Sequence, residues 1–115
     1  QRENYFLYKE ILQNIGDLKW PKEDSDYFIN GYRLPVLTER RDDLISFMLN
    51  RGEKLYNFYP VPLPYLPVFK NLGYKKGDFK VAEKIARECV ILSTSYLITR
   101  ERVRRFAALL KEFFR

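Results

Sequence analysis

Few residues in this chain are of a type that performs acid–base or metal chemistry. The 115 residues contain no histidine and a single cysteine, Cys89. Without an imidazole, the chain lacks a common metal ligand and the side chain best suited to proton transfer near neutral pH. Cys89 has no disulfide partner. It falls on the apolar face of a predicted helix, so we interpret it as a small buried hydrophobe rather than a reactive thiol. Residue types therefore give us no catalytic residue and no metal ligand.

Positive charge is the second chemical feature. Lys and Arg number 21 against 15 Asp and Glu, a formal net charge of +6. Such an excess attracts phosphates, whether in nucleotides, nucleic acids or membranes. The most concentrated basic residues are Arg100, Arg102, Arg104, Arg105, Lys111 and Arg115. Basic residues on one face usually form the solvated side of an amphipathic helix. We expect that role here, and not a nucleic-acid interface.

The size and composition fit one domain with a modest core. The chain is 46% hydrophobic and 17% aromatic, and domains commonly hold about 100–150 residues. No apolar run is long enough to span a bilayer and no signal-peptide pattern is present, so we expect a cytoplasmic protein, although a segment upstream of residue 1 would escape this test. The only methionine is Met48, and the helical pattern is already in place at residue 1. We therefore expect the chain to be part of a longer protein.

Apolar spacing predicts two helices in the first half of the chain. The first covers about residues 2–15 and ends at Gly16. The second has Thr38 as its N-cap and ends at Gly52. Its predicted buried stripe consists of Leu44, Ile45, Met48 and Leu49.

Two further helices are predicted in the second half. One is capped by Asp78 and runs through Cys89, and the other is capped by Thr99. Their predicted apolar faces are Ala82, Ile85, Ala86 and Cys89 in the third helix and Val103, Phe106, Ala107 and Leu110 in the fourth, with Phe113 or Phe114 at its end. Ahead of them, Pro60–Tyr74 holds four of the six prolines and is expected to be an irregular, fixed segment.

Short strands complete the prediction. Alternating residues favour a strand over Tyr27–Leu37. Pro35 cannot donate to a ladder, so this strand belongs at an edge or a bulge. Lys54–Tyr59 is predicted as a second strand and Val90–Leu92 as a short buried one, and Leu18–Trp20 is expected to be extended. The predicted fold class is α+β, a small antiparallel sheet covered by about four helices.

A specific order of motifs lies between Tyr59 and Thr99. The stretch reads YPVPLPYLPVF and then NLGYKKGDFKVAEKIARECVILSTSYLIT. Its signposts are Tyr59-Pro60, Pro62-Leu63, Pro67, Phe69, Gly73-Tyr74, Gly77-Asp78-Phe79, Val81-Ala82-Glu83 and Leu92-Ser93. This order resembles the C-terminal end of the DegT/DnrJ/EryC1/StrS family. Members of that family are pyridoxal-phosphate-dependent aminotransferases that act on keto sugars linked to nucleotides.

The resemblance implies that residues 1–115 form the small C-terminal domain of a longer enzyme, with residues 1–15 as the helix that links it to a large domain. In the family, the lysine that holds pyridoxal phosphate and the carboxylate that supports the cofactor lie in the large domain. We therefore expect neither a cofactor site nor activity in this chain alone. The parent enzyme would take its amino group from glutamate. It would form a homodimer, with no membrane or nucleic-acid partner.

The resemblance also implies that this domain forms one wall of the substrate cleft. The candidate cleft residues are Tyr56, Asn57, Phe58 and Tyr59, because aromatic rings can stack on bases and sugar faces. The alternative is that they are ordinary strand residues packing on both faces of the sheet. The chain departs from the family where Tyr56 replaces a frequent arginine, Phe58 and Pro64 replace frequent histidines, and Thr94-Ser95 replaces Leu-Pro.

A function of another class stays open at this point. The same scaffold would also suit a stand-alone, non-catalytic binding module for an acidic partner. Pro64-Tyr65-Leu66-Pro67 matches the PxxP pattern of polyproline-II ligands. These prolines fall on the family motif, however, so we favour a structural loop.

Overall fold

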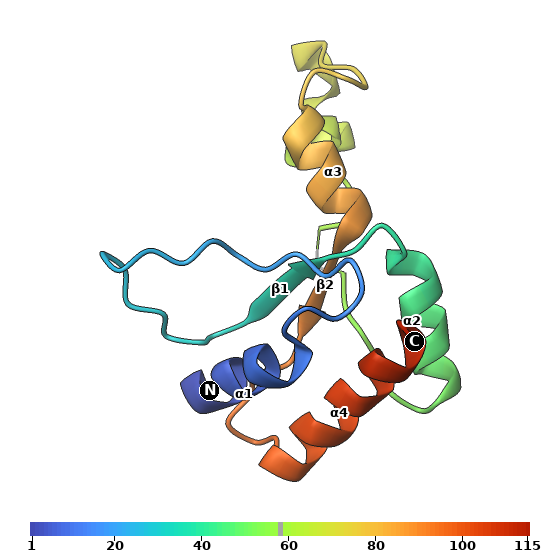
Figure 1. The fold of residues 1–115 in the computed structure, drawn as a ribbon. Helices are drawn as coiled ribbons and strands as arrows, with labels where there is room; N and C mark the ends of the chain where they lie inside the picture. The colour runs from blue at the N-terminus through green and yellow to red at the C-terminus, as the bar shows by residue number, and fades with distance from the viewer. Residues whose placement is uncertain (58) are drawn as a thin grey trace.

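A computed structural model describes residues 1–57 and 59–115. It contains four α-helices, two short 3-10 helices and one small antiparallel sheet, so the predicted α+β class is confirmed (Figure 1). In chain order the elements are α1 (Arg2–Leu12), β1 (Leu34–Leu37), α2 (Arg41–Asn50), η1 (Leu63–Tyr65), η2 (Pro67–Leu72), α3 (Lys80–Glu88), β2 (Cys89–Leu92) and α4 (Arg100–Phe113).

The sheet is narrower than predicted. Among the described residues, only β1 and β2 pair as strands, with Leu34 opposite Leu92 and Val36 opposite Val90. Of the described residues in the predicted strand Lys54–Tyr59, only Tyr56 forms a bridge, in which the Ile91 N–H donates to the Tyr56 carbonyl at 2.9 Å. For those residues the strand prediction was wrong, because a single bridge to β2 does not make a strand; Phe58 lies outside the described residues.

Pro35 lies where its missing N–H costs nothing. Leu37 exchanges two backbone hydrogen bonds with Lys19, at 2.9 and 3.0 Å, on the side of β1 away from β2. Residues two apart in a strand direct their N–H groups to the same side, so the nitrogen of Pro35 also faces away from β2. The predicted edge position of Pro35 and the extended conformation of Leu18–Trp20 around Lys19 agree with this geometry.

The predicted strand Tyr27–Leu37 is mostly loop. Residues 20–33 extend away from the body as a long irregular connection (Figure 1), and Tyr32 is 57% exposed. The loop is attached through the buried Thr94, whose hydroxyl donates to the carbonyls of Gly31 at 2.6 Å and Tyr32 at 2.9 Å. Alternation alone therefore predicted too long a strand, because among the described residues the pairing with β2 begins at Leu34.

The core lies between one face of the sheet and the helices α1, α2 and α4. Figure 1 shows α1 and α4 side by side beneath the sheet, with α2 flanking them. The fully buried side chains are Tyr8, Leu12, Leu34, Val36, Leu44, Met48, Val90, Leu92, Val103 and Leu110. The stripe predicted for the fourth helix is confirmed, because Val103, Phe106, Ala107 and Leu110 are all buried.

Two predicted stripes need correction. Leu49 is 55% exposed, and the half-buried Phe47 packs edge-on against Phe113 at 5.3 Å between ring centres. In α3, Ala86 is buried, but Ile85 is 43% exposed. The apolar face of α3 is thus left partly uncovered, because this helix projects away from the body (Figure 1).

The first helix ends earlier than predicted. α1 stops at Leu12, because Gln13 is extended and Asn14 adopts a left-handed φ of 60°. Gly16, the predicted stop, lies in the turn that follows, with a φ of 55°. A Cβ added there would lie 2.3 Å from the ring of Phe114, so a glycine is required.

The caps are also partly revised. Thr99 caps α4 as predicted, since its side chain accepts from the Arg102 N–H at 3.2 Å. Asp78 does not cap α3. It accepts from the Lys75 N–H, and α3 begins at Lys80, with Cys89 in β2.

Thr38 stands two residues before the N-cap position of α2, which is Arg40. Asp17 holds this entry. Its carboxylate accepts from the Thr38 hydroxyl at 2.6 Å and from the Glu39 N–H at 2.8 Å. The Thr38 hydroxyl oxygen in turn accepts from the Arg40 N–H at 3.1 Å.

Candidate functional site

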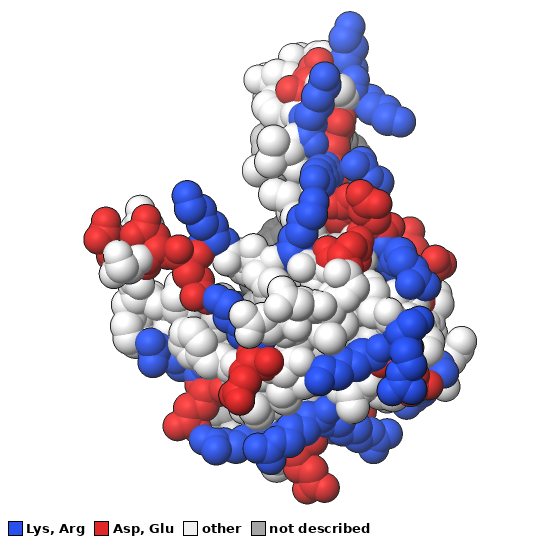
Figure 2. Space-filling view, viewed as in Figure 1, with Lys and Arg blue, Asp and Glu red and all other residues white. Residues whose placement is uncertain are grey.

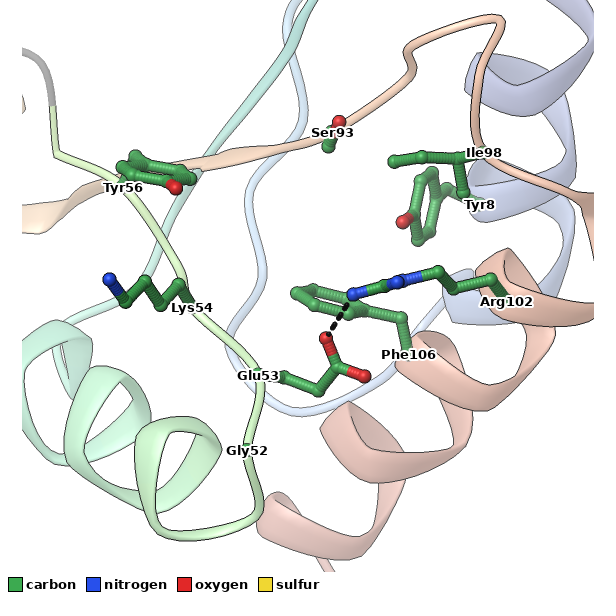
Figure 3. A pocket seen from close by; sticks show the side chains of 9 residues that line it. All are labelled: Tyr8, Gly52, Glu53, Lys54, Tyr56, Ser93, Ile98, Arg102 and Phe106. Atoms are coloured by element: carbon green, nitrogen blue, oxygen red, sulfur yellow. Dashed lines mark hydrogen bonds and ion pairs between the residues drawn. The ribbon is translucent and has the colours of Figure 1, made fainter.

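A polar pocket of about 360 Å³ lies where α1, α4 and the segments after α2 and β2 meet (Figure 3). Its lining residues are Tyr8, Gly52, Glu53, Lys54, Tyr56, Ser93, Ile98, Arg102 and Phe106. The helices supply the rigid wall, and the two chain segments after α2 and β2 supply the opposite side. Four separate parts of the sequence therefore build one concave surface.

A buried carboxylate sits in the wall of this pocket. Glu53 is 7% exposed, and its side chain meets Arg102 Nη2 at 3.1 Å (Figure 3). Arg105 Nε lies 3.9 Å from the same carboxylate. A buried carboxylate needs a cation of this kind to offset the loss of hydration. Burial, together with the Glu53 carboxylate, raises the pKa of the Tyr8 phenol far above its ordinary value, partly opposed by Arg102. The pocket thus presents a neutral phenol, hydroxyls and fixed charges, a surface suited to hydrogen-bonding a polar ligand.

The four predicted cleft residues do not gather in this single pocket. Tyr56 lines it and also lines a neighbouring pocket of about 260 Å³ beside the outer face of the sheet. Asn57 lies against the end of α3, and Tyr59 lines a third, apolar groove along α3. Phe58 lies outside the described residues. The described candidates therefore follow one path from the edge of the sheet to the base of α3.

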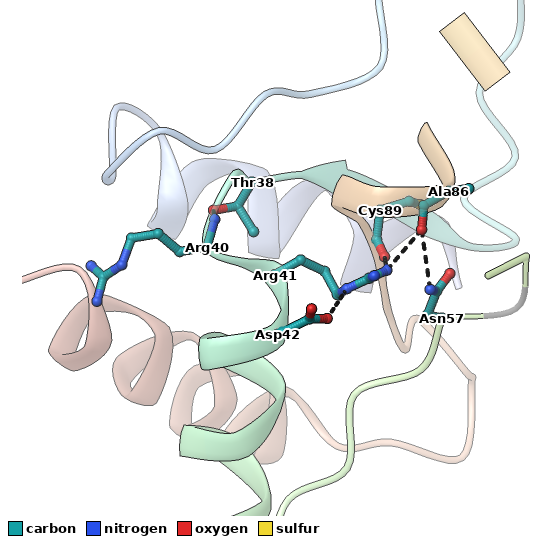
Figure 4. A network of polar contacts seen from close by, with 7 residues as sticks. All are labelled: Thr38, Arg40, Arg41, Asp42, Asn57, Ala86 and Cys89. Atoms are coloured by element: carbon teal, nitrogen blue, oxygen red, sulfur yellow. Dashed lines mark hydrogen bonds and ion pairs between the residues drawn. The ribbon is translucent and has the colours of Figure 1, made fainter. Parts of the chain in front are cut away.

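A polar cluster fixes this path at the end of α3 (Figure 4). Arg41 Nη1 donates to the Ala86 carbonyl at 2.9 Å and to the Cys89 carbonyl at 3.5 Å, and Asn57 Nδ2 donates to the same Ala86 carbonyl at 3.3 Å. The last carbonyls of a helix lack intrahelical partners, and a cation there is favourable. Asn57 Oδ1 is buried and has no hydrogen-bond partner among the described residues. No sequence signal linked Arg41 to α3, because 45 residues separate Arg41 from Ala86.

Three of the six basic residues predicted for the face of α4 form ion pairs within the chain. Arg100 pairs with Glu3 at 3.0 Å, and Arg102 and Arg105 both approach Glu53. Figure 2 shows that Lys and Arg predominate on this part of the surface, with fewer acidic residues among them. These pairs give Arg100, Arg102 and Arg105 contacts within the chain, and the absence of a nucleic-acid partner stays a prediction. Among the described residues, none of the helices could cross a membrane, and no group of three metal-ligating side chains occurs.

The chain's own residues do not fit pyridoxal phosphate. The cofactor is held by a lysine whose amine is activated by desolvation or by a neighbouring charge. Among the described residues, all lysines are exposed or half-exposed. Lys54 lines the polar pocket, yet it is exposed to solvent. Nothing in the described part of the chain therefore provides the setting that a Schiff-base lysine requires.

The described residues thus form an α+β arrangement with several surface pockets. The chain belongs to the DegT/DnrJ/EryC1/StrS aminotransferase family, whose sequence model matches residues 1–111. The resemblance drawn from the motifs after Tyr59 is thereby confirmed.

Two curated relatives show how much of a family member this chain represents. The "Pleiotropic regulatory protein" of Geobacillus stearothermophilus is 31% identical over 117 residues, which cover 100% of this chain and 32% of that protein. The "Erythromycin biosynthesis sensory transduction protein EryC1" of Saccharopolyspora erythraea is 30% identical over 105 residues, which cover 90% of this chain and 28% of that protein. The chain spans about a third of the length of these relatives.

Solved structures support the fold. S. venezuelae DesV, crystallised in complex with a ketimine intermediate, matches with a TM-score of 0.91 and 25% identity over 97% of this chain and 30% of its own. DesI, studied in the presence of its TDP-sugar product, matches with a TM-score of 0.78 and 21% identity, and 29% of its chain is covered. The match to DesI concerns the fold alone.

Proposed function

We propose that this chain is the small C-terminal domain of a pyridoxal-phosphate-dependent aminotransferase that acts on a nucleotide-linked keto sugar. The observation that carries the proposal is the match of nearly the whole chain to about 30% of DesV, a protein crystallised with a ketimine intermediate. The part of the parent outside this chain would supply the lysine and hold the cofactor. The amino donor would be glutamate, and the parent would work as a cytoplasmic homodimer.

In this proposal the domain contributes a wall of the substrate cleft. Tyr56 carries that role best, because it borders both the polar pocket and the pocket beside the outer sheet face. It is 51% exposed, so its ring is accessible for stacking on a base or a sugar face. The TDP-sugar product of DesI is a ligand of this chemical kind.

The first experiment tests whether the 115-residue chain can bind pyridoxal phosphate by itself or only as part of the longer protein. The 115-residue chain, titrated with pyridoxal phosphate and reduced with borohydride, is expected to show no saturable labelling of a single lysine. The product of the whole open reading frame is expected to show that labelling and to transfer an amino group from glutamate to a nucleotide-linked keto sugar. Saturable labelling of the 115-residue chain at one lysine would contradict the division of labour proposed here.

A second experiment tests the cleft wall in the whole product. Tyr56→Ala should raise the KM for the sugar substrate roughly tenfold if its ring stacks on the ligand, with little change in the KM for glutamate. Tyr27→Ala is the matched control, because Tyr27 is 72% exposed on the loop before β1. Equal effects of the two substitutions on the KM for the sugar would show that Tyr56 does not line the substrate cleft.

The stand-alone binding module predicts the opposite pattern. An open reading frame of only this length, from start to stop, together with salt-sensitive binding of an acidic partner, would favour it over the enzyme. The ion pairs of Arg100, Arg102 and Arg105 within the chain leave less of the basic face for such a partner.

A further inference from the structure

An arm without a core projects from the domain. It comprises the residues from Tyr59 to Ile85, that is η1, η2 and most of α3, and it stands away from the body in Figure 1. None of the residues from 59 to 85 is buried. Its exposed large apolar residues are Tyr59, Val61, Leu63, Val68, Leu72, Tyr74, Val81 and Ile85, with exposures of 43–77%.

Polar contacts give this arm a defined shape all the same. The Glu83 carboxylate accepts from the Gly77 N–H at 2.6 Å and from the Tyr65 hydroxyl at 2.7 Å. The Gly77 hydrogen bond, followed by that of Tyr65, lowers the pKa of Glu83. The Tyr65 oxygen accepts from the Phe79 N–H at 3.2 Å, and the Tyr65 and Phe79 rings meet edge-on at 6.1 Å. Ordering a segment costs conformational entropy, and here apolar residues of the arm are at most partly buried, so little apolar burial within the arm offsets that cost.

The apolar side of the arm forms a groove. It has a volume of about 540 Å³ and lies between the segment after Tyr59 and α3. Its apolar lining includes Pro60, Val61, Leu63, Leu66, Ala82 and Ile85. Figure 2 shows Lys and Arg crowding one side of the arm, while a white, uncharged surface covers the other. Contiguous exposed apolar surface of this kind marks an interaction site on a soluble protein.

We propose that this groove is the docking surface for the part of the parent protein that lies outside this chain, and that the docked surface has an apolar centre and an acidic rim. The proposal rests on the proposed function, since it takes the parent to be a longer enzyme. The lengths of the relatives support such a docking partner, because this chain covers only 32% and 28% of those proteins, and the rest of each is long enough to contain it.

Charge argues against a second copy of the arm as the occupant. From residue 59 to residue 85 there are five basic residues and two acidic ones, which gives 5 − 2 = +3. The basic residues are Lys70, Lys75, Lys76, Lys80 and Lys84, and the acidic ones are Asp78 and Glu83. Two such arms in contact would repel one another, whereas an acidic rim would complement the charge.

Hydrogen–deuterium exchange of the arm tests the proposal directly. Amides of residues 59–85 are compared between the 115-residue chain and the product of the whole open reading frame. We expect exchange in this segment to slow by about tenfold or more in the longer protein, because docking suppresses local opening. Peptides from the core of α4 serve as the internal reference.

Two matched substitutions locate the contact. Leu63 is 65% exposed in the groove and Leu49 is 55% exposed on α2. In the 115-residue chain, Leu63→Glu and Leu49→Glu should both leave the denaturation midpoint unchanged. In the longer protein, Leu63→Glu alone should restore fast exchange in the arm, because it places a charge in the apolar contact and faces an acidic rim.

Each remaining outcome overturns the proposal in a recognisable way. Dimerisation of the 115-residue chain in the ultracentrifuge, abolished by Leu63→Glu, would assign the groove to a second copy. A longer protein that transaminates while its arm exchanges as fast as in the 115-residue chain would overturn the docking surface and leave the proposed function standing. An open reading frame no longer than this chain would overturn both.

Discussion

Replacing Phe106 by alanine tests whether α4 closes the core. Phe106 is 8% exposed, and its ring meets the ring of Tyr8 edge-on, with 6.3 Å between centres and an interplanar angle of 79°. Truncating a buried phenylalanine costs about 3–5 kcal/mol in the free energy of unfolding. The ring also borders the polar pocket of about 360 Å³. Water can therefore enter the vacated space, and we expect a cost of about 3 kcal/mol.

Urea melts of the 115-residue chain provide the assay. With a denaturant slope of about 1–3 kcal/mol/M, the midpoint should fall by roughly 1–3 M. Phe28→Ala is the matched control, since Phe28 is 78% exposed and contacts the Arg2 guanidinium at 4.8 Å from its ring centre. That change should cost about 1 kcal/mol or less. Arg104→Ala, on the exposed face of α4, should change stability by about 0.5 kcal/mol or less.

The result that refutes this reasoning is simple to recognise. If Phe106→Ala melts at the midpoint of the unmodified chain, α4 is not part of the core in solution. The helix would then be an exposed element available to a partner. An equal loss for Phe28→Ala would show instead that the assay reports loop contacts rather than core packing.

Three further predictions concern single polar groups. Asp17→Ala should destabilise the chain by about 1–2 kcal/mol, as loss of a helix cap does, in urea melts where Asp24→Ala changes little. Because burial and Glu53 raise the pKa of Tyr8, the folded chain holds that proton more tightly than the unfolded chain does. The stability that Tyr8 contributes should therefore be full below about pH 10 and be lost above it, and Tyr8→Phe should lose less stability than the unmodified chain in urea melts above pH 10. Burial also raises the pKa of Cys89, so iodoacetamide should alkylate it more slowly in the folded chain than in urea, and equal rates would contradict its burial.

Local signals in the sequence were sufficient to predict α4 and β2. The Thr99 cap and the apolar repeat after it predicted α4 and its buried face correctly. The predicted strand Val90–Leu92 lies within β2. Both depend on interactions between residues close in the chain or on a periodicity that only one type of element satisfies.

Other elements depended on partners that the sequence does not reveal. The alternation of Tyr32, Leu34 and Val36 predicted a strand over Tyr27–Leu37, but no strand among the described residues pairs with residues 27–33. Thr38 is a favourable capping residue, yet Asp17 arrives from another segment and moves the start of α2 to Arg41. Partners such as Asp17 and Thr38 are far apart in the sequence, so no local repeat of residue types indicates that they will meet. Their contact can be seen only in the folded chain.

The sequence by itself determined the class of this protein. The motif order after Tyr59 identified the family, and composition and periodicity determined an α+β domain with a buried fourth helix, because these signals depend on residue type and near neighbours. Only the tertiary structure decided how the predicted cleft residues are distributed. It placed Tyr56 at the edge of β2 and Tyr59 in the groove of the arm. It also left residues 59–85 without a buried side chain, because whether an apolar residue is covered depends on contacts between segments far apart in the chain.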